Sequence, residues 1–143
     1  DRFNSLAHRT TWLRSDLVSE GMQVNTMFDG GICRDGSILN YARIHKITIQ
    51  CWSPFQYGAI EGTFMGNPDY PEVNEALQVI GKKYGITDSA VAVAWILRHP
   101  ADMQVIAGTC NQKRMRDIVK ACDVKLSRED WYWVYKMAGN VIP

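Results

Sequence analysis

The sequence predicts an α/β fold in which parallel strands alternate with helices. Three observations support this prediction: short runs of β-branched and apolar residues, longer segments with helical periodicity between them, and glycine, proline or capping residues at their boundaries. The expected element order is αβαβααβαα, which implies parallel strands joined by right-handed crossovers. The 143 residues suit roughly one domain, but three strands are too few to close a barrel.

The N-terminal part is expected to hold a helix followed by a strand. Leu6 to Glu20 has apolar residues near helical spacing, with Ser5 as its N-cap and Gly21 as its stop. Met22 to Phe28 alternates apolar and polar residues, as a half-buried strand does, and ends in the turn cluster Asp29-Gly30-Gly31.

A second helix and a second strand come next. An apolar stripe between Ser37, the expected cap, and about His45 predicts the helix. The β-branched and aromatic run from Ile47 to Trp52 predicts the strand, which ends at Ser53-Pro54. Residues 53–70 contain three glycines and two prolines with little periodicity. They are expected to form a long loop, and loops of this length tend to be functional.

Two further helices are predicted after this loop. The first begins at Pro71, because proline fits the first helical turn, and stops at Gly85. Asp88 is expected to cap the next helix, through His99. Its stretch Val91 to Ala94 also fits a strand, but the cap, the alanines and the following proline favour a helix.

The C-terminal part is expected to hold a third strand and two helices. The strand is the short run Gln104 to Ala107, and the helix Lys113 to Ala121 follows it. Ser127, with Asp130 three residues later, resembles a capping box at the start of the last helix, which runs through Ala138. A sheet of three parallel strands has two open edges, which stable domains normally cover or pair.

Composition excludes several classes of protein. Hydrophobic residues make up 46% of the chain, and its net charge of +1 gives no overall attraction for nucleic acids or anionic membranes. The longest apolar runs, such as Ala90 to Leu97, are far shorter than the ~20 residues that cross a bilayer. The chain begins Asp1-Arg2-Phe3, without the apolar core of a signal peptide. We therefore expect a cytoplasmic protein.

The cysteines Cys33, Cys51, Cys110 and Cys122 are too irregularly spaced for a CxxC pair, and no histidine lies three or four residues from any of them. They are expected to be reduced thiols rather than zinc ligands or a disulfide scaffold.

The residues that often carry catalysis have simpler structural explanations here. The histidines His8, His45 and His99 have no acidic or cysteine partner at ligand or triad spacing, so surface or capping roles are expected. Glu129-Asp130 lies in the first turn of the last helix, where carboxylates complement the helix dipole, and a catalytic pair is the weaker alternative. The aromatic residues near the C-terminus are expected to pack, although five tryptophans in the chain suggest an aromatic-lined pocket.

Two strand ends are better candidates, because ligands of parallel α/β folds bind at the carboxyl ends of strands. Trp52 to Gly58 offers successive backbone N–H groups and a flat indole, although a structural turn explains its proline and glycine equally well. Gly108 to Arg116 combines a small-residue turn with a helix N-terminus that carries three basic residues. Helix N-termini and arginine bind phosphate, and a solvated basic face is the alternative.

Together, three segments resemble the C-terminal part of an aldo-keto reductase, a family of (β/α)8 barrels that use NADPH. Met22-Gln23-Val24-Asn25 is similar to an element of the sixth barrel strand, whose glutamine binds the nicotinamide carboxamide. Trp52-Ser53-Pro54-Phe55 resembles the element that ends the seventh strand, where the aromatic ring stacks on nicotinamide and the serine and backbone hold the pyrophosphate. Val105 to Thr109 with Arg114 resembles the eighth strand and the helix that grips the 2′-phosphate.

The resemblance implies a single partial domain over residues 1–143: the last three β/α units of a TIM (β/α)8 barrel, incomplete as given. The implied cofactor is NADPH, although Gly108 and Ile118 stand where many members have a phosphate-binding lysine and an adenine-contacting asparagine, so the preference over NADH rests mainly on Arg114. The implied cofactor-binding residues are Gln23, Trp52, Ser53, Phe55, Gln56, Gly108, Thr109, Cys110, Asn111 and Arg114.

The implied activity is reduction of a small carbonyl substrate to an alcohol by hydride transfer from nicotinamide. The family's catalytic Asp, Tyr, Lys and His lie on the second to fourth strands, whereas this chain begins like the segment after the fifth. No catalytic residue is assigned, and the chain alone is expected to be inactive. The alternative is a non-enzymatic regulatory or interaction protein on the same fold. Open strand edges predict self-association, and no nucleic-acid or membrane partner is expected.

Overall fold

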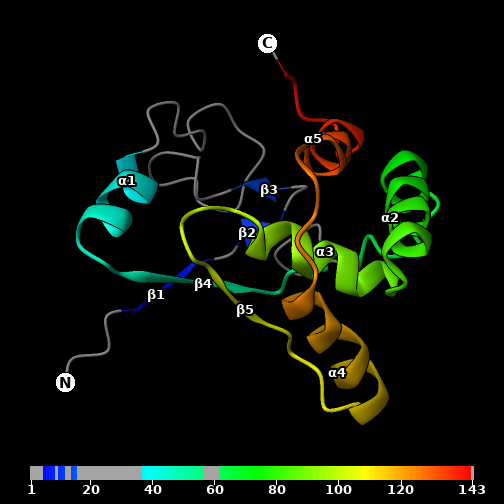
Figure 1. The fold of residues 1–143 in the computed structure, drawn as a ribbon, viewed down its shortest axis with the longest axis horizontal. Helices are drawn as coiled ribbons and strands as arrows, with labels where there is room; N and C mark the ends of the chain where they lie inside the picture. The colour runs from blue at the N-terminus through cyan, green and yellow to red at the C-terminus, as the bar shows by residue number, and fades with distance from the viewer. Residues whose placement is uncertain (1–4, 9, 12–13, 16–36, 57–61, 143) are drawn as a thin grey trace.

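The computed structural model describes residues 5–8, 10–11, 14–15, 37–56 and 62–142, which form an α/β arrangement (Figure 1). The strands form a parallel sheet and a short antiparallel pair. Among the helices, α3 lies at the centre, with α2, α4 and α5 around it. The strands are β1 (Ser5–His8), β2 (Thr10–Thr11), β3 (Arg14–Ser15), β4 (Thr48–Trp52) and β5 (Gln104–Ile106). The helices are α1 (Ser37–Ile44), α2 (Pro71–Tyr84), α3 (Asp88–Leu97), α4 (Gln112–Val119), the 3₁₀ helix η3 (Lys120–Asp123) and α5 (Arg128–Met137).

The three-stranded sheet has the order β1-β4-β5, and both pairs are parallel. Ser5 lies opposite Thr48 at the start of the β1–β4 pair, and Trp52 lies opposite Ile106 at the end of the β4–β5 pair. β4 therefore has a neighbour on each side. The predicted strand Met22 to Phe28 lies outside the described residues, and the place beside β4 opposite β5 is taken by β1.

The prediction of a helix from Leu6 to Glu20 is wrong, because this stretch contains β1, β2 and β3. The backbone of β1 pairs with β4, a contact about forty residues away along the chain that local periodicity cannot show. Tertiary pairing of this kind routinely overrides helical propensity. One local signal pointed the same way: Thr10 and Thr11 are adjacent β-branched residues, which favour strands over helices.

The helices α1 to α5 and the strands β4 and β5 confirm the predictions with boundary shifts of at most two residues, and the 3₁₀ helix η3 was not predicted. α2 begins with proline in its first turn and ends at Gly85, whose φ of 68° lies in the left-handed region that glycine adopts readily. The cap of α3 is Thr87, not Asp88: the Thr87 hydroxyl accepts a bond from the N–H of Ala90. α5 starts at the predicted cap Ser127, whose hydroxyl accepts from the N–H of Asp130 at 3.1 Å.

The core is built around α3, whose residues Ala90 to Ile96 are all buried. A helix that is apolar all round belongs in the interior, because it has no face suited to water. Ile49 and Cys51 of β4 are fully buried, whereas Trp52 is 39% exposed, since successive strand side chains point to opposite faces. Among the helices that the structure describes, none has the length and apolar character to span a membrane.

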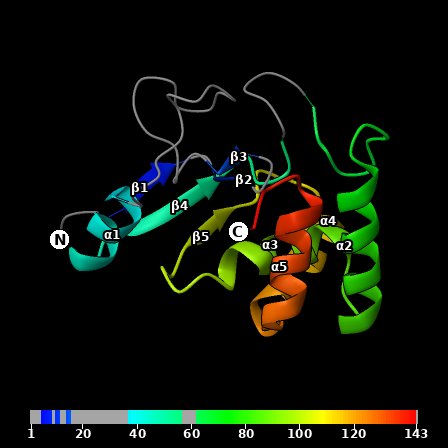
Figure 2. The ribbon, with the colours of Figure 1, turned by 90° about the horizontal axis from the view of Figure 1, so that it is seen from above.

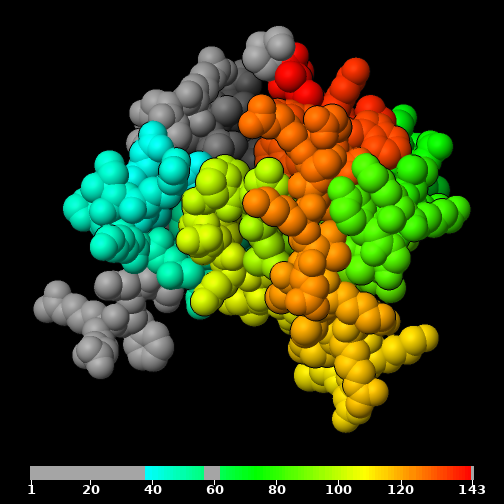
Figure 3. Space-filling view, viewed as in Figure 1, coloured from blue at the N-terminus to red at the C-terminus, as the bar shows by residue number. Residues whose placement is uncertain are grey.

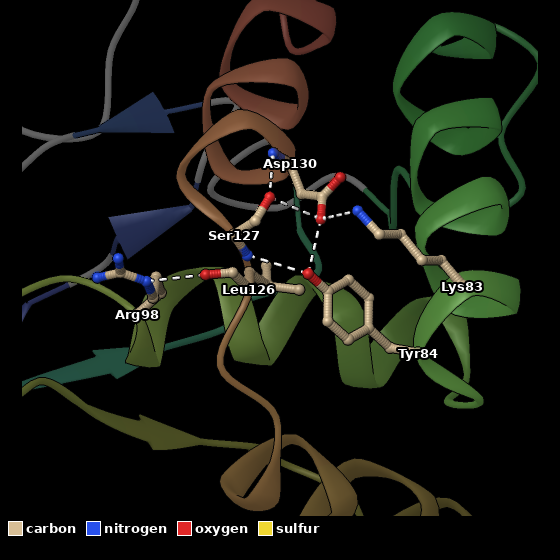
Figure 4. A network of polar contacts seen from close by, with 6 residues as sticks. All are labelled: Lys83, Tyr84, Arg98, Leu126, Ser127 and Asp130. Carbon is tan, nitrogen blue, oxygen red and sulfur yellow. Dashed lines mark hydrogen bonds and ion pairs between the residues drawn. The ribbon is translucent and has the colours of Figure 1, made fainter.

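A buried carboxylate joins α2 to α5 (Figure 4). Asp130 Oδ2 accepts bonds from Lys83 Nζ at 2.7 Å, from the Tyr84 hydroxyl at 2.7 Å and from the Ser127 hydroxyl at 2.9 Å. The backbone N–H of Ser127 donates to Tyr84 Oη at 3.0 Å. Burial opposes ionisation of Asp130, but these donors hold its pKa below the usual value. Because these contacts account for a buried carboxylate at this position, Asp130 is a structural residue rather than half of a catalytic pair.

Replacing Asp130 with asparagine is expected to lower the free energy of unfolding near neutral pH by about 1 to 3 kcal/mol, toward the lower end because the Lys83 side chain lies largely in solvent. The depressed folded-state pKa means that the carboxylate contributes stability above the unfolded pKa of about 4 and loses it as the pH falls through the folded value. Urea unfolding of both proteins across this pH range measures the effect. The control Asp117→Asn, at an exposed pair on α4, is expected to change little. A gap between Asp130→Asn and the parent that stays constant down to pH 2 would contradict this linkage.

Candidate functional site

The carboxyl ends of β4 and β5 lie at the same edge of the sheet (Figure 2). The two strands are parallel neighbours, and Trp52 is paired with Ile106 at the last position of each. The segments that leave the strands, residues 53–56 and 107–111, therefore begin side by side. Parallel α/β folds place their ligands at such an edge.

The segment after β4 presents a partly exposed indole and a tight turn. Trp52 is 39% exposed, and Ser53 has a φ of 53°, in the left-handed region that residues other than glycine seldom adopt. The N–H of Gln56 donates to the carbonyl oxygen of Ser53 at 3.1 Å and closes the turn. Strained turns of this kind cluster at binding sites, where tertiary contacts hold them in place.

The following loop is fastened by Asn74, a buried residue of α2. Its Nδ2 donates to the carbonyl oxygens of Phe64 and Tyr70, each at 2.8 Å, and its Oδ1 accepts from the N–H of Gly66 at 2.8 Å. Phe64 is fully buried, and its N–H donates to the carbonyl oxygen of Phe55 at 3.1 Å. Asn74 thus positions the turn after β4 indirectly. This role of Asn74 was not predicted, although a polar residue on the apolar face of a predicted helix is a usable signal.

The segment after β5 forms a left-handed turn and then the N-terminus of α4. Gly108 has a φ of 60°, and the Thr109 hydroxyl accepts from the N–H of Asn111 at 3.2 Å. Asn111 is the cap of α4, and its Oδ1 accepts from the N–H of Arg114 at 3.0 Å. Within the described part of the chain, the N–H groups of the first two helical residues, Gln112 and Lys113, have no acceptor.

This geometry suits an anion held beside a flat ring. The open N–H groups and dipole of α4 attract negative charge, and the exposed Arg114 adds a guanidinium in its first turn. Trp52 offers its ring at the end of β4, the strand that pairs with β5 in the sheet. A ligand with a flat ring at one end and phosphate groups at the other matches these features.

The structure places all but one of the predicted cofactor-binding residues at this edge. Trp52, Ser53, Phe55 and Gln56 follow β4, and Gly108 to Asn111 with Arg114 follow β5. Gln23 lies outside the described residues. Cys110 and Cys122 are exposed and Cys51 is buried, and none of these three forms a disulfide within the described part of the chain, while Cys33 lies outside it.

Sequence comparison places known reductases among the relatives of this chain. The model of the aldo/keto reductase family matches residues 33–137. A 6-dehydroglucose reductase of Agrobacterium fabrum is 37% identical over 100 residues, which are 70% of this chain and 32% of that protein. A 6-dehydroglucose reductase of Novosphingobium aromaticivorans is 27% identical over 112 residues, 78% of this chain and 36% of that protein. The chain spans about a third of the length of these relatives.

Structural comparison agrees on the fold. A thermostable aldo-keto reductase, Tm1743, solved with the inhibitor epalrestat, superposes with a TM-score of 0.55 at 20% sequence identity. The match covers 71% of this chain and 34% of that one. At this identity the likeness concerns the fold, which in this family is a TIM barrel. The family match extends over most of the described residues, including both strand ends of the candidate site, and the chain therefore belongs to the aldo/keto reductase family.

Proposed function

We propose that this chain is the cofactor-binding part of an NADPH-dependent aldo-keto reductase, an oxidoreductase that reduces carbonyls to alcohols. The observation that carries the proposal is the pairing of Trp52 with Ile106, which brings both motif-bearing strand ends to one edge of the sheet. In this assignment Trp52 stacks on the nicotinamide. Ser53, Phe55 and Gln56 follow the pyrophosphate, and the α4 N-terminus with Arg114 holds the 2′-phosphate. The bound cofactor supplies the hydride.

The strand order supports placing this chain as the last three β/α units of the barrel. β1, β4 and β5 then correspond to the sixth, seventh and eighth strands, and β1 takes the position that the resemblance had given to Met22 to Phe28. This leaves the carboxamide-binding role of Gln23 without support from the strand order.

The two faces of the sheet also suit this placement. On the face away from Ile49 and Cys51, Gln50 donates to Gln104 at 3.2 Å, and Ile106 is 44% exposed. In a closed barrel this face lies inside.

Cofactor binding is the direct test. Titration with NADPH is expected to quench tryptophan fluorescence, because Trp52 contacts the nicotinamide, and Trp52→Leu is expected to lose part of the quenching. Trp133→Leu is the matched control, since Trp133 is 36% exposed and lies on α5 rather than on either strand of this edge. The assignment fails if the parent binds NADPH and both variants retain the same quenching.

The carbonyl substrate to test first is 6-dehydroglucose, because two relatives bear the name of its reductase. Activity belongs to the intact barrel in this proposal, since this chain contributes binding and orientation of the cofactor rather than a proton donor.

The edge strands β1 and β5 are also expected to drive self-association, because their unpaired backbone groups can template further strands. Light scattering of the chain over a range of concentrations is expected to show oligomers. A lysine on an edge strand discourages such pairing, so Ile106→Lys is expected to reduce association. Val119→Lys is the control, at a residue on α4 that is 54% exposed. A monodisperse monomer at every concentration contradicts the proposal.

A further inference from the structure

A cavity lies beside the segment that precedes β5, at the opposite end of this strand from the cofactor edge. It has a volume of about 460 Å³ and lies between the end of α3 and the start of α5. In Figure 3 the segment that precedes β5, in yellow-green, lies between α1 in cyan and the orange start of α5. The cavity is lined by Arg98, His99, Pro100, Arg128, Trp131 and Tyr132.

The described lining of this cavity holds cationic and neutral groups but no carboxylate. Arg98 is fixed in place, because its Nε donates to the carbonyl oxygen of Leu126 at 2.9 Å. Its terminal nitrogens are turned away from that bond, as Figure 4 shows, and remain available as donors. Arg128 supplies a second guanidinium from the first turn of α5. Two guanidinium groups facing one cavity repel each other unless an anion lies between them.

His99 continues the lining of this cavity toward α1 as a neutral ring. Its Nδ1 accepts from the N–H of Ala101 at 3.2 Å, so the proton of the neutral ring is on Nε2. Burial lowers the pKa of His99, and the positive charge of Arg43 lowers it further. A neighbouring cavity of about 280 Å³ shares Pro100 with the first and is lined by Arg43 and Lys46, with one carboxylate, that of Asp102, among the other residues. Several cations therefore gather at this end of a chain whose net charge is only +1.

The aromatic wall of the cavity is rigid. Trp131 stacks on Trp95 with ring centroids 4.7 Å apart, and each indole N–H donates to the other residue's carbonyl oxygen, at 2.9 and 3.0 Å. Tyr132 packs edge-on against Trp131 at 5.1 Å and is 47% exposed. A fixed wall lowers the ordering cost of binding a small molecule, and the phenol of Tyr132 adds a donor.

We propose that this cavity binds a phosphate monoester, with the phosphate between Arg98 and Arg128 and the organic part against Tyr132. Two planar guanidinium groups can each bond two oxygens of a phosphate dianion, so they suit a phosphate better than they suit a ligand with a single carboxylate. The cavity lies at the opposite end of β5 from the α4 N-terminus, so the proposal is independent of the cofactor assignment.

The experiment is a titration of the folded chain with phenyl phosphate and, separately, with inorganic phosphate, followed by NMR of the His99 ring. Both probes are expected to shift the His99 signal, and phenyl phosphate is expected to bind more tightly and to shift the Tyr132 ring as well. Equal affinity for phenyl phosphate and inorganic phosphate means that the cavity binds free phosphate rather than a phosphate monoester, and contradicts the proposed contact of the organic part with Tyr132. A folded chain whose His99 signal does not move with either probe overturns the proposal.

Charge-matched variants separate this site from general attraction to a basic surface. Arg128→Ala is expected to weaken phenyl phosphate by about 10-fold or more, as loss of a charge-assisted bond implies. Arg116→Ala removes the same charge from the exposed α4. It is expected to change the affinity for phenyl phosphate by no more than about twofold, which is well below the effect of losing one charge-assisted bond. Arg128→Lys, which keeps the charge, is expected to retain part of the affinity and serves if the alanine variant is unstable. Equal weakening by Arg128→Ala and Arg116→Ala contradicts a specific site.

Discussion

The chain by itself is expected to show no NADPH-dependent reduction of simple aldehydes or of 6-dehydroglucose. Positioned proton transfer contributes about 10² to 10⁴ in rate, and the proposed function gives this chain no proton donor. The loss of NADPH absorbance, followed with enough protein to detect a thousandth of ordinary turnover, measures the effect.

The 6-dehydroglucose reductase of Agrobacterium fabrum is the positive control for the substrate. A turnover of this chain within tenfold of about 10 per second, the median for enzymes, would contradict the assignment of the chain as a cofactor-binding part. It would also require a proton donor among the residues present.

Replacing Arg114 with alanine is expected to weaken NADPH by about 10- to 150-fold and to leave NADH nearly unchanged. The reason is that a guanidinium on the 2′-phosphate makes charge-assisted bonds of about 1.5 to 3 kcal/mol, and each 1.4 kcal/mol is about tenfold in affinity. NADH lacks that phosphate. Fluorescence titrations with both cofactors, on this chain or on an intact barrel that contains it, measure the two affinities.

Arg116→Ala is the matched control, because it removes the same charge from the same helix two residues further on, where the side chain leaves the helix in a different direction. It is expected to change NADPH affinity far less than Arg114→Ala. If Arg114→Ala weakens NADPH and NADH equally, Arg114 has a structural role and the position of the phosphate site is wrong.

Local chemistry determines most of the helices. A proline in the first turn and a glycine at the end delimit α2, and Ser127 caps α5 with its side-chain oxygen, as predicted. The cap of α4, Asn111, was not predicted, although it is a capping residue type directly before the helix. These signals work because the groups that satisfy a helix end lie within a few residues of it in the sequence. The same locality explains why both strand ends of the candidate site were found.

The first strand could not be predicted from the sequence in the same way. β1 exists because its backbone bonds to that of β4, and nothing within Ser5–His8 records this partner. The helical spacing of the neighbouring leucines was therefore misleading. The place of β1 beside β4 also bears on the strand assignment, because β1 takes the position next to β4, while the role of Gln23, outside the described residues, stays a prediction.

By itself, then, the sequence determined the α/β class, the helix ends and the two strand ends with binding chemistry, because each of these depends on residues close together in the chain. Only the tertiary structure decided which strand lies beside β4, that Asn74 fastens the loop after it, and that Asp130 joins α2 to α5. It also decided that Arg98 and Arg128 share one cavity. These contacts link residues 4 to 47 positions apart, and their energies come from burial and pairing that exist only after the chain has folded.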